Sequence, residues 1–376
     1  MSDTEPPLEA PAGPPSRTAD EAAFRRRLEA LPCKPHDRFF RLVFEHPLEA
    51  GALLRAALPG AVATWIDWAT LRQEPSAVVT AEDLAEDVRD LLFACRLASP
   101  GAEPALLLLE HLSTPRRYVA LTLTAYQVGS WRRWHLATPA AGLPPAFGVV
   151  VLQGPEPWRG PGSIAELLAG PPALLALARA HTPTSSPAIL ELGALSYAEL
   201  LSRVDRPLAR VALALLKAGR TDARLVDLVP LLAADLRALG ADPTGRLLLR
   251  AVGVYACCVR SDTQEELVEA IRRAAGPPAA EAIQTGAQIL IERGRALGRE
   301  EGREEGREEG REEGREEGRE EGRLEEARRL ALRLIERRFS ALPAEAAARV
   351  AAADPATIEG WLDRLQEAAG LEDLLG

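Results

Sequence analysis

Two short apolar runs joined by a turn constrain the fold of this chain more than any other feature. The first run extends from Leu91 to Leu97 and the second from Ala105 to Leu109, and residues 98–104 between them are rich in Pro and Gly. Runs of this length bounded by turn residues are typical of β-strands, so the segment predicts a β-hairpin. We therefore expect a sheet near the centre of the fold.

Each run carries a carboxylate at one end. Asp90 directly precedes the first run and Glu110 directly follows the second. Because side chains alternate between the faces of a strand, Glu110 and Leu112 are expected to point the same way. Two carboxylates on adjacent strands could share a divalent cation such as Mg²⁺ or Mn²⁺, which prefer oxygen ligands. Acidic residues at strand ends are also common as solvated groups at the rim of a sheet.

Several short motifs follow one another between residues 36 and 158. They are His36-Asp-Arg-Phe-Phe-Arg-Leu-Val-Phe44, Leu58-Pro59, Ile66-Asp67 with Leu71, Asp90-Leu-Leu-Phe93, Glu110-His-Leu-Ser113, Tyr126, and Pro145 to Gly154 with Trp158. In this order they resemble the Rpn/YhgA-like family of recombination-promoting nucleases in the PD-(D/E)XK superfamily. The resemblance implies an α/β fold with a restriction-endonuclease-like αβββαβ core. It also implies a divalent metal at Asp90 and Glu110 and DNA as the substrate.

One position departs from the pattern of the family. The family usually carries Gln, and the superfamily Lys or a polar substitute, where Leu112 stands in this chain. That side chain positions or activates the attacking water, whereas leucine can neither donate nor accept a hydrogen bond. The chain contains only two lysines, Lys34 and Lys217. A lysine that replaces the missing group is therefore not expected near Glu110.

Three other polar residues of these motifs receive structural interpretations. His36 falls near the start of the first predicted helix, and Asp37 beside it is expected to act as an N-terminal charge or cap. His111 lies between the two metal-site positions and points to the opposite face of the strand. We expect His111 to have a packing or structural role.

Two function classes follow from these observations. The family resemblance favours a metal-dependent DNA endonuclease in which Asp90 and Glu110 are catalytic. Leu112 and the formal net charge of −10 favour a protein that keeps the nuclease fold without catalysis and acts as an oligomeric binding or regulatory module. A transposase that joins strands rests on the family's name alone.

The arginines are candidates for contacts with DNA. Arg38 and Arg41 belong to a basic cluster on or before the first predicted helix, and Arg116 and Arg117 follow soon after Glu110. These four side chains could line a groove for phosphates. Scattered surface arginines are the alternative, and the net charge does not decide between the two.

Composition gives little sign of a zinc site, a leader or a membrane span. The four cysteines show no Cys-x-x-Cys spacing and the five histidines are scattered. The N-terminal segment is acidic and proline-rich, unlike a signal peptide, and no apolar run approaches the roughly 20 residues of a membrane span. We therefore expect a cytoplasmic protein with reduced thiols and no membrane contact.

Composition also divides the chain into five segments. We expect a disordered N-terminus, the nuclease-like core, a mainly helical extension, a long charged helix and a C-terminal helical hairpin over residues 1–20, 21–165, 166–278, 279–329 and 330–376, respectively. Pro207 and Pro230 are expected to split two helices of the extension. The last segment is similar to a small uncharacterised domain found after the nuclease-like region in related chains.

A low-complexity repeat occupies the charged helix. Gly-Arg-Glu-Glu occurs six times without interruption from Gly298 to Glu321. Glu and Arg favour helix, whereas each glycine costs about 1 kcal/mol relative to alanine. A glycine stripe would let a partner backbone approach closely, so we expect a long exposed helix that forms a homo-oligomer with other copies of the chain. A solvated spacer helix without a partner is the alternative.

Overall fold

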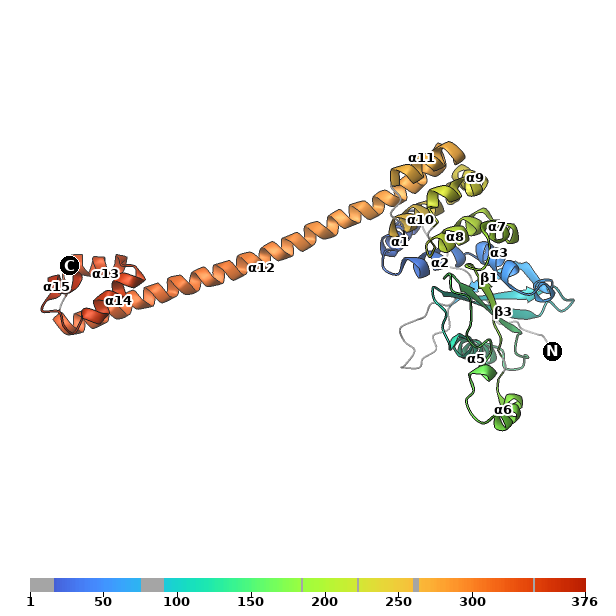
Figure 1. The fold of residues 1–376 in the computed structure, drawn as a ribbon, viewed down its shortest axis with the longest axis horizontal. Helices are drawn as coiled ribbons and strands as arrows, with labels where there is room; N and C mark the ends of the chain where they lie inside the picture. Colours follow the sequence, from blue (N-terminus) through green and yellow to red (C-terminus); the bar gives the residue numbers. More distant parts are fainter. Residues whose placement is uncertain (1–16, 76–90, 184, 222, 260–263, 341) are drawn as a thin grey trace, which may run out of the picture. The chain divides into compact units, whose positions relative to one another are not determined.

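The computed structural model describes residues 17–75, 91–183, 185–221, 223–259, 264–340 and 342–376 (Figure 1). Its elements are α1 (Arg17–Ala30), α2 (Pro35–Phe44), α3 (Pro47–Ala57), α4 (Gly60–Ala63), β1 (Ile66–Glu74), β2 (Leu91–Leu97), β3 (Pro104–Leu112), α5 (Val119–Ala137), β4 (Ala146–Leu152), η1 (Ile164–Leu167), α6 (Pro172–Ala178), η2 (Arg179–His181), β5 (Ala188–Glu191), α7 (Tyr197–Arg203), α8 (Pro207–Ala218), α9 (Leu225–Ala241), α10 (Pro243–Val259), α11 (Gln264–Ala275), α12 (Pro277–Phe339), α13 (Ala344–Ala352), α14 (Pro355–Arg364) and α15 (Leu371–Leu375). The described chain is therefore an α/β protein, as predicted.

A five-stranded mixed sheet organises the first part of the chain. The strands lie in the order β1-β2-β3-β4-β5. β2 pairs antiparallel with both β1 and β3, and β4 pairs parallel with both β3 and β5. β2 and β3 form the predicted hairpin, whose register runs from Leu91 opposite Leu109 to Arg96 opposite Pro104. Helix α5 is the crossover between the parallel strands β3 and β4. Helices before β1, then three strands, α5 and β4 give the predicted αβββαβ order.

Helices cover the two faces of the sheet in separate layers (Figure 1). Leu107 and Leu109 of β3 face the larger core, which α2, α3 and α8 also line, whereas Leu106 and Leu108 face the smaller core beneath α5. A strand that is covered on both faces needs apolar residues throughout rather than an alternating pattern. This requirement explains the uninterrupted leucine run of β3.

Prolines have different effects in two helices of the extension. Pro207 is the first residue of α8, where its missing N–H costs nothing, so it separates α7 from α8 as predicted. Pro230 lies inside α9, which continues from Leu225 to Ala241. The predicted split at Pro230 is therefore wrong. A proline near the start of a helix removes one internal hydrogen bond, and the packing of α9 against α8, α10 and α11 offsets that loss.

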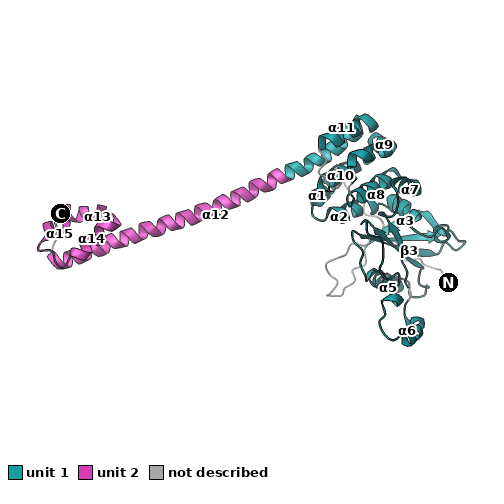
Figure 2. Ribbon diagram, in the orientation of Figure 1, with its two compact units in different colours: residues 1–293 teal, residues 294–376 magenta. Residues whose placement is uncertain are grey.

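The chain divides into two compact units, residues 1–293 and 294–376 (Figure 2). In the second unit, Ile335, Val350 and Trp361 belong to an apolar cluster that holds the C-terminal helices together. The predicted long charged helix is confirmed as α12, and every residue from 294 to 323 is exposed. None of the helices within the described ranges is both long enough and apolar enough to cross a membrane.

Two glycines in the first unit let α10 and α12 approach backbone to backbone. A Cβ atom on Gly253 would lie 2.1 Å from the carbonyl oxygen of Ile283, and one on Gly286 would lie 2.0 Å from that of Arg250. A Cβ atom on Gly310, in the repeat, meets nothing within 4 Å. Glycine therefore has a steric role at the start of α12 and none within the repeat of a single chain.

Gly253→Ala is expected to destabilise the first unit, because the added methyl group can be accommodated only if the α12 backbone moves. We expect the free energy of unfolding to fall by about 2–3 kcal/mol, measured by urea denaturation followed by circular dichroism. Gly310→Ala is the matched control and should instead raise helix stability by up to about 1 kcal/mol. An unchanged unfolding midpoint for Gly253→Ala would contradict the close helix contact.

Candidate functional site

Only one of the two predicted metal-binding carboxylates falls within the described residues. Asp90 lies outside them and directly precedes β2 in the sequence. Glu110 is the third residue from the end of β3 and is 4% exposed. The alternation of β3 places it on the face covered by α5, with Leu108 and Leu112. Joint metal binding by Asp90 and Glu110 stays a prediction.

Leu112, the residue that departs from the expected family pattern, has apolar surroundings. Leu112 is 1% exposed and packs in a cluster with Val119 and Leu152. Trp158 packs against the same cluster, and its buried indole Nε1–H has no hydrogen-bond partner in the part of the chain that the structure describes. Leu112 is therefore shielded from solvent and cannot position a water molecule.

Lys217 does not replace the missing polar group. Its Nζ donates to the carbonyl oxygen of Leu192 at 2.8 Å and lies 5.4 Å from the ring centre of Tyr197. Burial lowers the pKa of Lys217. Lys217 thus ties α8 to the loop after β5, and α8 covers the face of the sheet opposite Glu110.

The four arginines predicted to contact DNA come from two separate elements. Arg38 and Arg41 lie on α2, where the Arg38 guanidinium donates to the carbonyl oxygen of Ala30. Arg116 and Arg117 are exposed in the loop before α5, with the Arg117 guanidinium 5.7 Å from the ring centre of Tyr118. α2 and α5 cover opposite faces of the sheet, so these arginines do not form one continuous row on a single helix.

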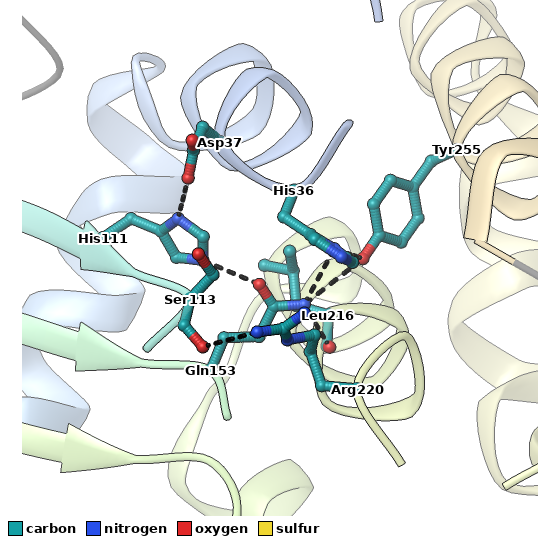
Figure 3. A network of polar contacts seen from close by, with 8 residues as sticks. All are labelled: His36, Asp37, His111, Ser113, Gln153, Leu216, Arg220 and Tyr255. Carbon is teal, nitrogen blue, oxygen red and sulfur yellow. Dashed lines mark hydrogen bonds and ion pairs between the residues drawn. The ribbon is translucent and has the colours of Figure 1, made fainter. Parts of the chain in front are cut away.

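A buried polar network on the other face of β3 was not predicted from the sequence (Figure 3). His111 Nδ1 lies 2.9 Å from Asp37 Oδ1, and His111 Nε2 lies 3.1 Å from Gln153 Oε1. The ring of Phe40 stacks on His111 with 4.6 Å between ring centres. His111 therefore joins α2, β3 and the residue that follows β4, a structural role in addition to its packing against Phe40.

Gln153 extends the network to a second histidine (Figure 3). Its Nε2 donates to the carbonyl oxygen of Leu216 at 2.6 Å and lies 2.9 Å from His36 Nδ1. The hydroxyl of Tyr255 lies 2.7 Å from the same His36 nitrogen. Because the carbonyl of Leu216 can only accept, it fixes the amide so that Gln153 Oε1 faces His111. These largely buried groups therefore connect helices α2, α8 and α10 to strand β3.

The charge state of His36 is constrained by this arrangement. Burial lowers the pKa of His36 to about 4, the charges of Arg220 and His111 also lower it, and Asp37 opposes them. A neutral imidazole can accept a hydrogen bond at Nδ1 from the Tyr255 hydroxyl or the Gln153 amide, and a protonated one cannot. The network therefore requires neutral His36.

Polar residues in apolar surroundings are the signal that could have revealed the network. Gln153 directly follows the apolar strand β4, and His111 interrupts the apolar run of β3. Asp37 was expected only as an N-terminal charge or cap. It does lie in the first turn of α2, and it also binds His111.

A pocket of about 420 Å³ lies at the carboxyl ends of β3 and β4. It is lined by residues 113–115, 154–156 and 219–221 together with Val259. Because β3 and β4 are parallel, their carboxyl ends meet at one edge of the sheet, where open α/β sheets commonly bind ligands. The pocket begins three residues after Glu110 on β3.

A family described as putative transposase, YhgA-like, matches residues 34–241, which is more than half of the 376 residues. The chain belongs to the YhgA-like transposase family. The matched region contains the whole sheet and extends to the end of α9, so the predicted family is confirmed. No solved structure matches the chain. In this YhgA-like chain, Glu110 and all network residues except Tyr255 lie inside the family region.

Protonation of His36 is expected to destabilise the fold. The pKa of His36 is about 4 in the folded chain and roughly 6.5 when unfolded. Between these pH values the unfolded state binds the proton more readily than the folded state. The free energy of unfolding therefore has its full value above about pH 6.5 and falls as the pH drops toward 4. His36 is partly exposed, so we expect a loss on the order of 1 kcal/mol.

The measurement is urea denaturation of the wild type and of His36→Gln at about pH 7 and about pH 5, since glutamine cannot titrate in this range. The difference in stability between the two pH values should be smaller for His36→Gln. Equal pH dependence of both proteins would show that His36 does not titrate with a lowered pKa.

Proposed function

We propose that this YhgA-like protein is a divalent-metal-dependent DNA endonuclease. The observation that carries the proposal is Glu110, a carboxylate that is 4% exposed near the carboxyl end of the central strand β3. Burial of a carboxylate is unfavourable unless the group is paired, hydrogen-bonded or bound to a metal. The αβββαβ order around Glu110 and the family of the chain both support a nuclease-type function.

Glu110 and Asp90 would hold the cation in this proposal. Mg²⁺ and Mn²⁺ prefer carboxylate oxygens, and Mg²⁺ is often held by one or two carboxylates with water and phosphate oxygens as further ligands. The described ranges contain no group of three or more His, Cys, Asp or Glu side chains able to hold a metal. The type of ligand at Glu110 fits such a cation. When bound, the cation would stabilise charge that develops on the phosphodiester.

The other side chains would bind phosphates or exclude water, and none of them would transfer a proton. Arg116 and Arg117 are exposed after the end of β3, where guanidinium groups can bind and orient phosphates. Leu112 and its apolar neighbours keep water away from the face of β3 that carries Glu110. No polar group occupies position 112 to orient an attacking water. We therefore propose slow cleavage by the wild-type protein.

The burial of Leu112 also favours a second function. Leu112 is 1% exposed within an apolar cluster, so its site is built for packing. A chain that kept the nuclease fold without hydrolysis would act as an oligomeric binding or regulatory protein. Cleavage assays on variants of Glu110 and Leu112 separate the two functions.

Leu112→Gln is expected to raise nicking of supercoiled plasmid in the presence of Mg²⁺ or Mn²⁺, because the amide can orient the attacking water. Contributions of this kind are worth about 10²–10⁴-fold in rate. Glu110→Ala in the Leu112→Gln background should abolish the gain. The rates are measured with each variant from the same purification.

Leu112→Met is the matched control, since it alters packing without adding a polar group. The thermal stability of each variant is measured in parallel, because a buried amide without partners costs about 1–3 kcal/mol. Equal cleavage by the wild type and a folded Leu112→Gln would show that another residue has the water-positioning role. Cleavage that survives Glu110→Ala would exclude Glu110 as the metal ligand. Inactivity of every folded variant would support the non-catalytic function.

We also propose that α12 forms a homo-oligomer through its repeat. Residues 294–323 are all exposed, and the Cβ positions of the repeat glycines meet nothing within the chain. Glycine in an exposed helix costs about 1 kcal/mol per residue unless close packing recovers it. The repeat carries both Arg and Glu along its length, so a second copy of the helix can form ion pairs with it. At the start of the same helix, Gly286 already packs against the backbone of α10.

Replacement of the repeat glycines from Gly298 to Gly322 by alanine is expected to raise helicity and change the oligomeric mass. Alanine favours helix but fills the space that a partner backbone would occupy. Circular dichroism and multi-angle light scattering measure the two effects. Gly360→Ala is the control, because a Cβ atom there also meets nothing within 4 Å but lies outside the repeat. A monomeric mass both before and after the replacement would show that the repeat is a spacer.

A further inference from the structure

The pocket at the carboxyl ends of β3 and β4 contains an arginine, Arg220, that the proposed nuclease site does not use. Arg220 follows α8 and is exposed, and its Nη2 donates to the carbonyl oxygen of Ser113 at 3.2 Å. Figure 3 shows its guanidinium beside Ser113 and Gln153. The bond to Ser113 orients the guanidinium over the end of β3 and uses one of its five N–H donors.

Among the described residues, no carboxylate forms an ion pair with Arg220. Other arginines of the helical extension form ion pairs, such as Arg206 with Glu49 at 2.7 Å and Arg224 with Glu266 at 2.6 Å. Arg220 forms no ion pair with any residue that the structure describes. Its positive charge acts on the polar network, because it is among the causes that lower the pKa of His36. The net charge of the chain is −10, so Arg220 gives this pocket a positive charge that the chain as a whole does not have.

Two glycines of the pocket lining stand where neighbouring groups come very close. A Cβ atom on Gly154 would lie 2.9 Å from the carbonyl oxygen of Ser113, and one on Gly219 would lie 2.6 Å from the Tyr255 hydroxyl. Glycine at position 154 lets two of the lining loops approach each other through their backbones, and glycine at position 219 leaves space for the side chain of Tyr255. The exposed Thr114 adds a hydroxyl to the lining, and the exposed Glu156 adds a carboxylate.

We propose that this pocket binds a phosphodiester group of a nucleic-acid strand, with Arg220 as the charged contact. Guanidinium groups bind phosphate oxygens through paired N–H donors. The inference rests on the proposed nuclease function, because Ser113 directly follows β3 and lies three residues after Glu110, about 10 Å away at the rise of an extended chain. A nucleic-acid strand placed at Glu110 would bring neighbouring phosphates to Arg220. Arg220 would then fix the position of the strand without any contact to its bases.

DNA binding measured without cleavage tests the pocket separately from catalysis. The probe is a fluorescently labelled DNA duplex, titrated with the full chain in EDTA at salt concentrations from about 50 to about 200 mM. Arg220→Ala should weaken binding about tenfold at low salt and reduce the slope of log K against log salt by about 0.9, the contribution of one phosphate contact. Arg220→Lys should keep the slope and lose part of the affinity, since lysine keeps the charge but not the paired donors.

Two further variants are matched to Arg220→Ala. Arg237 is also exposed and donates to one main-chain carbonyl, that of Ala274 at 2.7 Å, but it does not line the pocket. Arg237→Ala should leave affinity and slope unchanged. Glu156→Gln removes the exposed carboxylate of the pocket and should strengthen binding about two- to threefold, because it removes a repulsion from the phosphate.

Equal affinities of the wild type, Arg220→Ala and Arg237→Ala would overturn the inference, as would a wild type that does not bind DNA. Equal losses in both alanine variants would also overturn it, because they would report general surface charge. A wild type that cleaves through Glu110 while Arg220→Ala binds normally would leave the proposed function intact and exclude the pocket. Specific loss of binding in Arg220→Ala, in a chain that cleaves nothing, would support the pocket and exclude the endonuclease.

Discussion

Burial of both faces of β3 is the constraint on which the rest of the structure depends. Every residue of this strand after Pro104 is buried, so each polar group on it needs a partner supplied by another element. His111 obtains its partners from α2 and from the end of β4, which fixes both elements against the strand. Glu110 lies on the opposite face, under α5, where a polar function has to be built inside an apolar layer. Fold and candidate site are therefore set by the same strand.

A local pattern was sufficient to predict the hairpin of β2 and β3, which follows from two runs of apolar residues and the turn residues between them. Helix α5 and strand β4 were expected from the αβββαβ order that the family resemblance implies. The polar network could not be predicted in the same way, because Asp37 and His111 are separated by 74 positions and His36 and Gln153 by 117. The pocket likewise needs three loops that only the sheet brings together. Pro230 shows the reverse case, in which packing overrides a local signal that breaks helices in isolation.

The place of Glu110 on β3 could be predicted from the sequence, whereas its role as a metal ligand stays a prediction. The resemblance identified Glu110, and the strand alternation that places it beside Leu112 follows from β-geometry. Whether leucine at that position is compatible with hydrolysis depends on how water is held near Glu110, which no sequence pattern specifies. The structure adds that Leu112 is packed against other apolar side chains, so a polar side chain at this position would need a new partner.

The bond between His36 and Tyr255 has a consequence for how the protein is made. The two residues are 219 positions apart, and α10, which carries Tyr255, follows the entire sheet in the sequence. At ordinary rates of synthesis, roughly 10–40 s separate the appearance of one residue from that of the other. During this interval the polar network around α2 and β3 lacks the contact that α10 contributes through Tyr255. The polar contact between α2 and α10 can therefore form only after the whole family region, residues 34–241, has been synthesised.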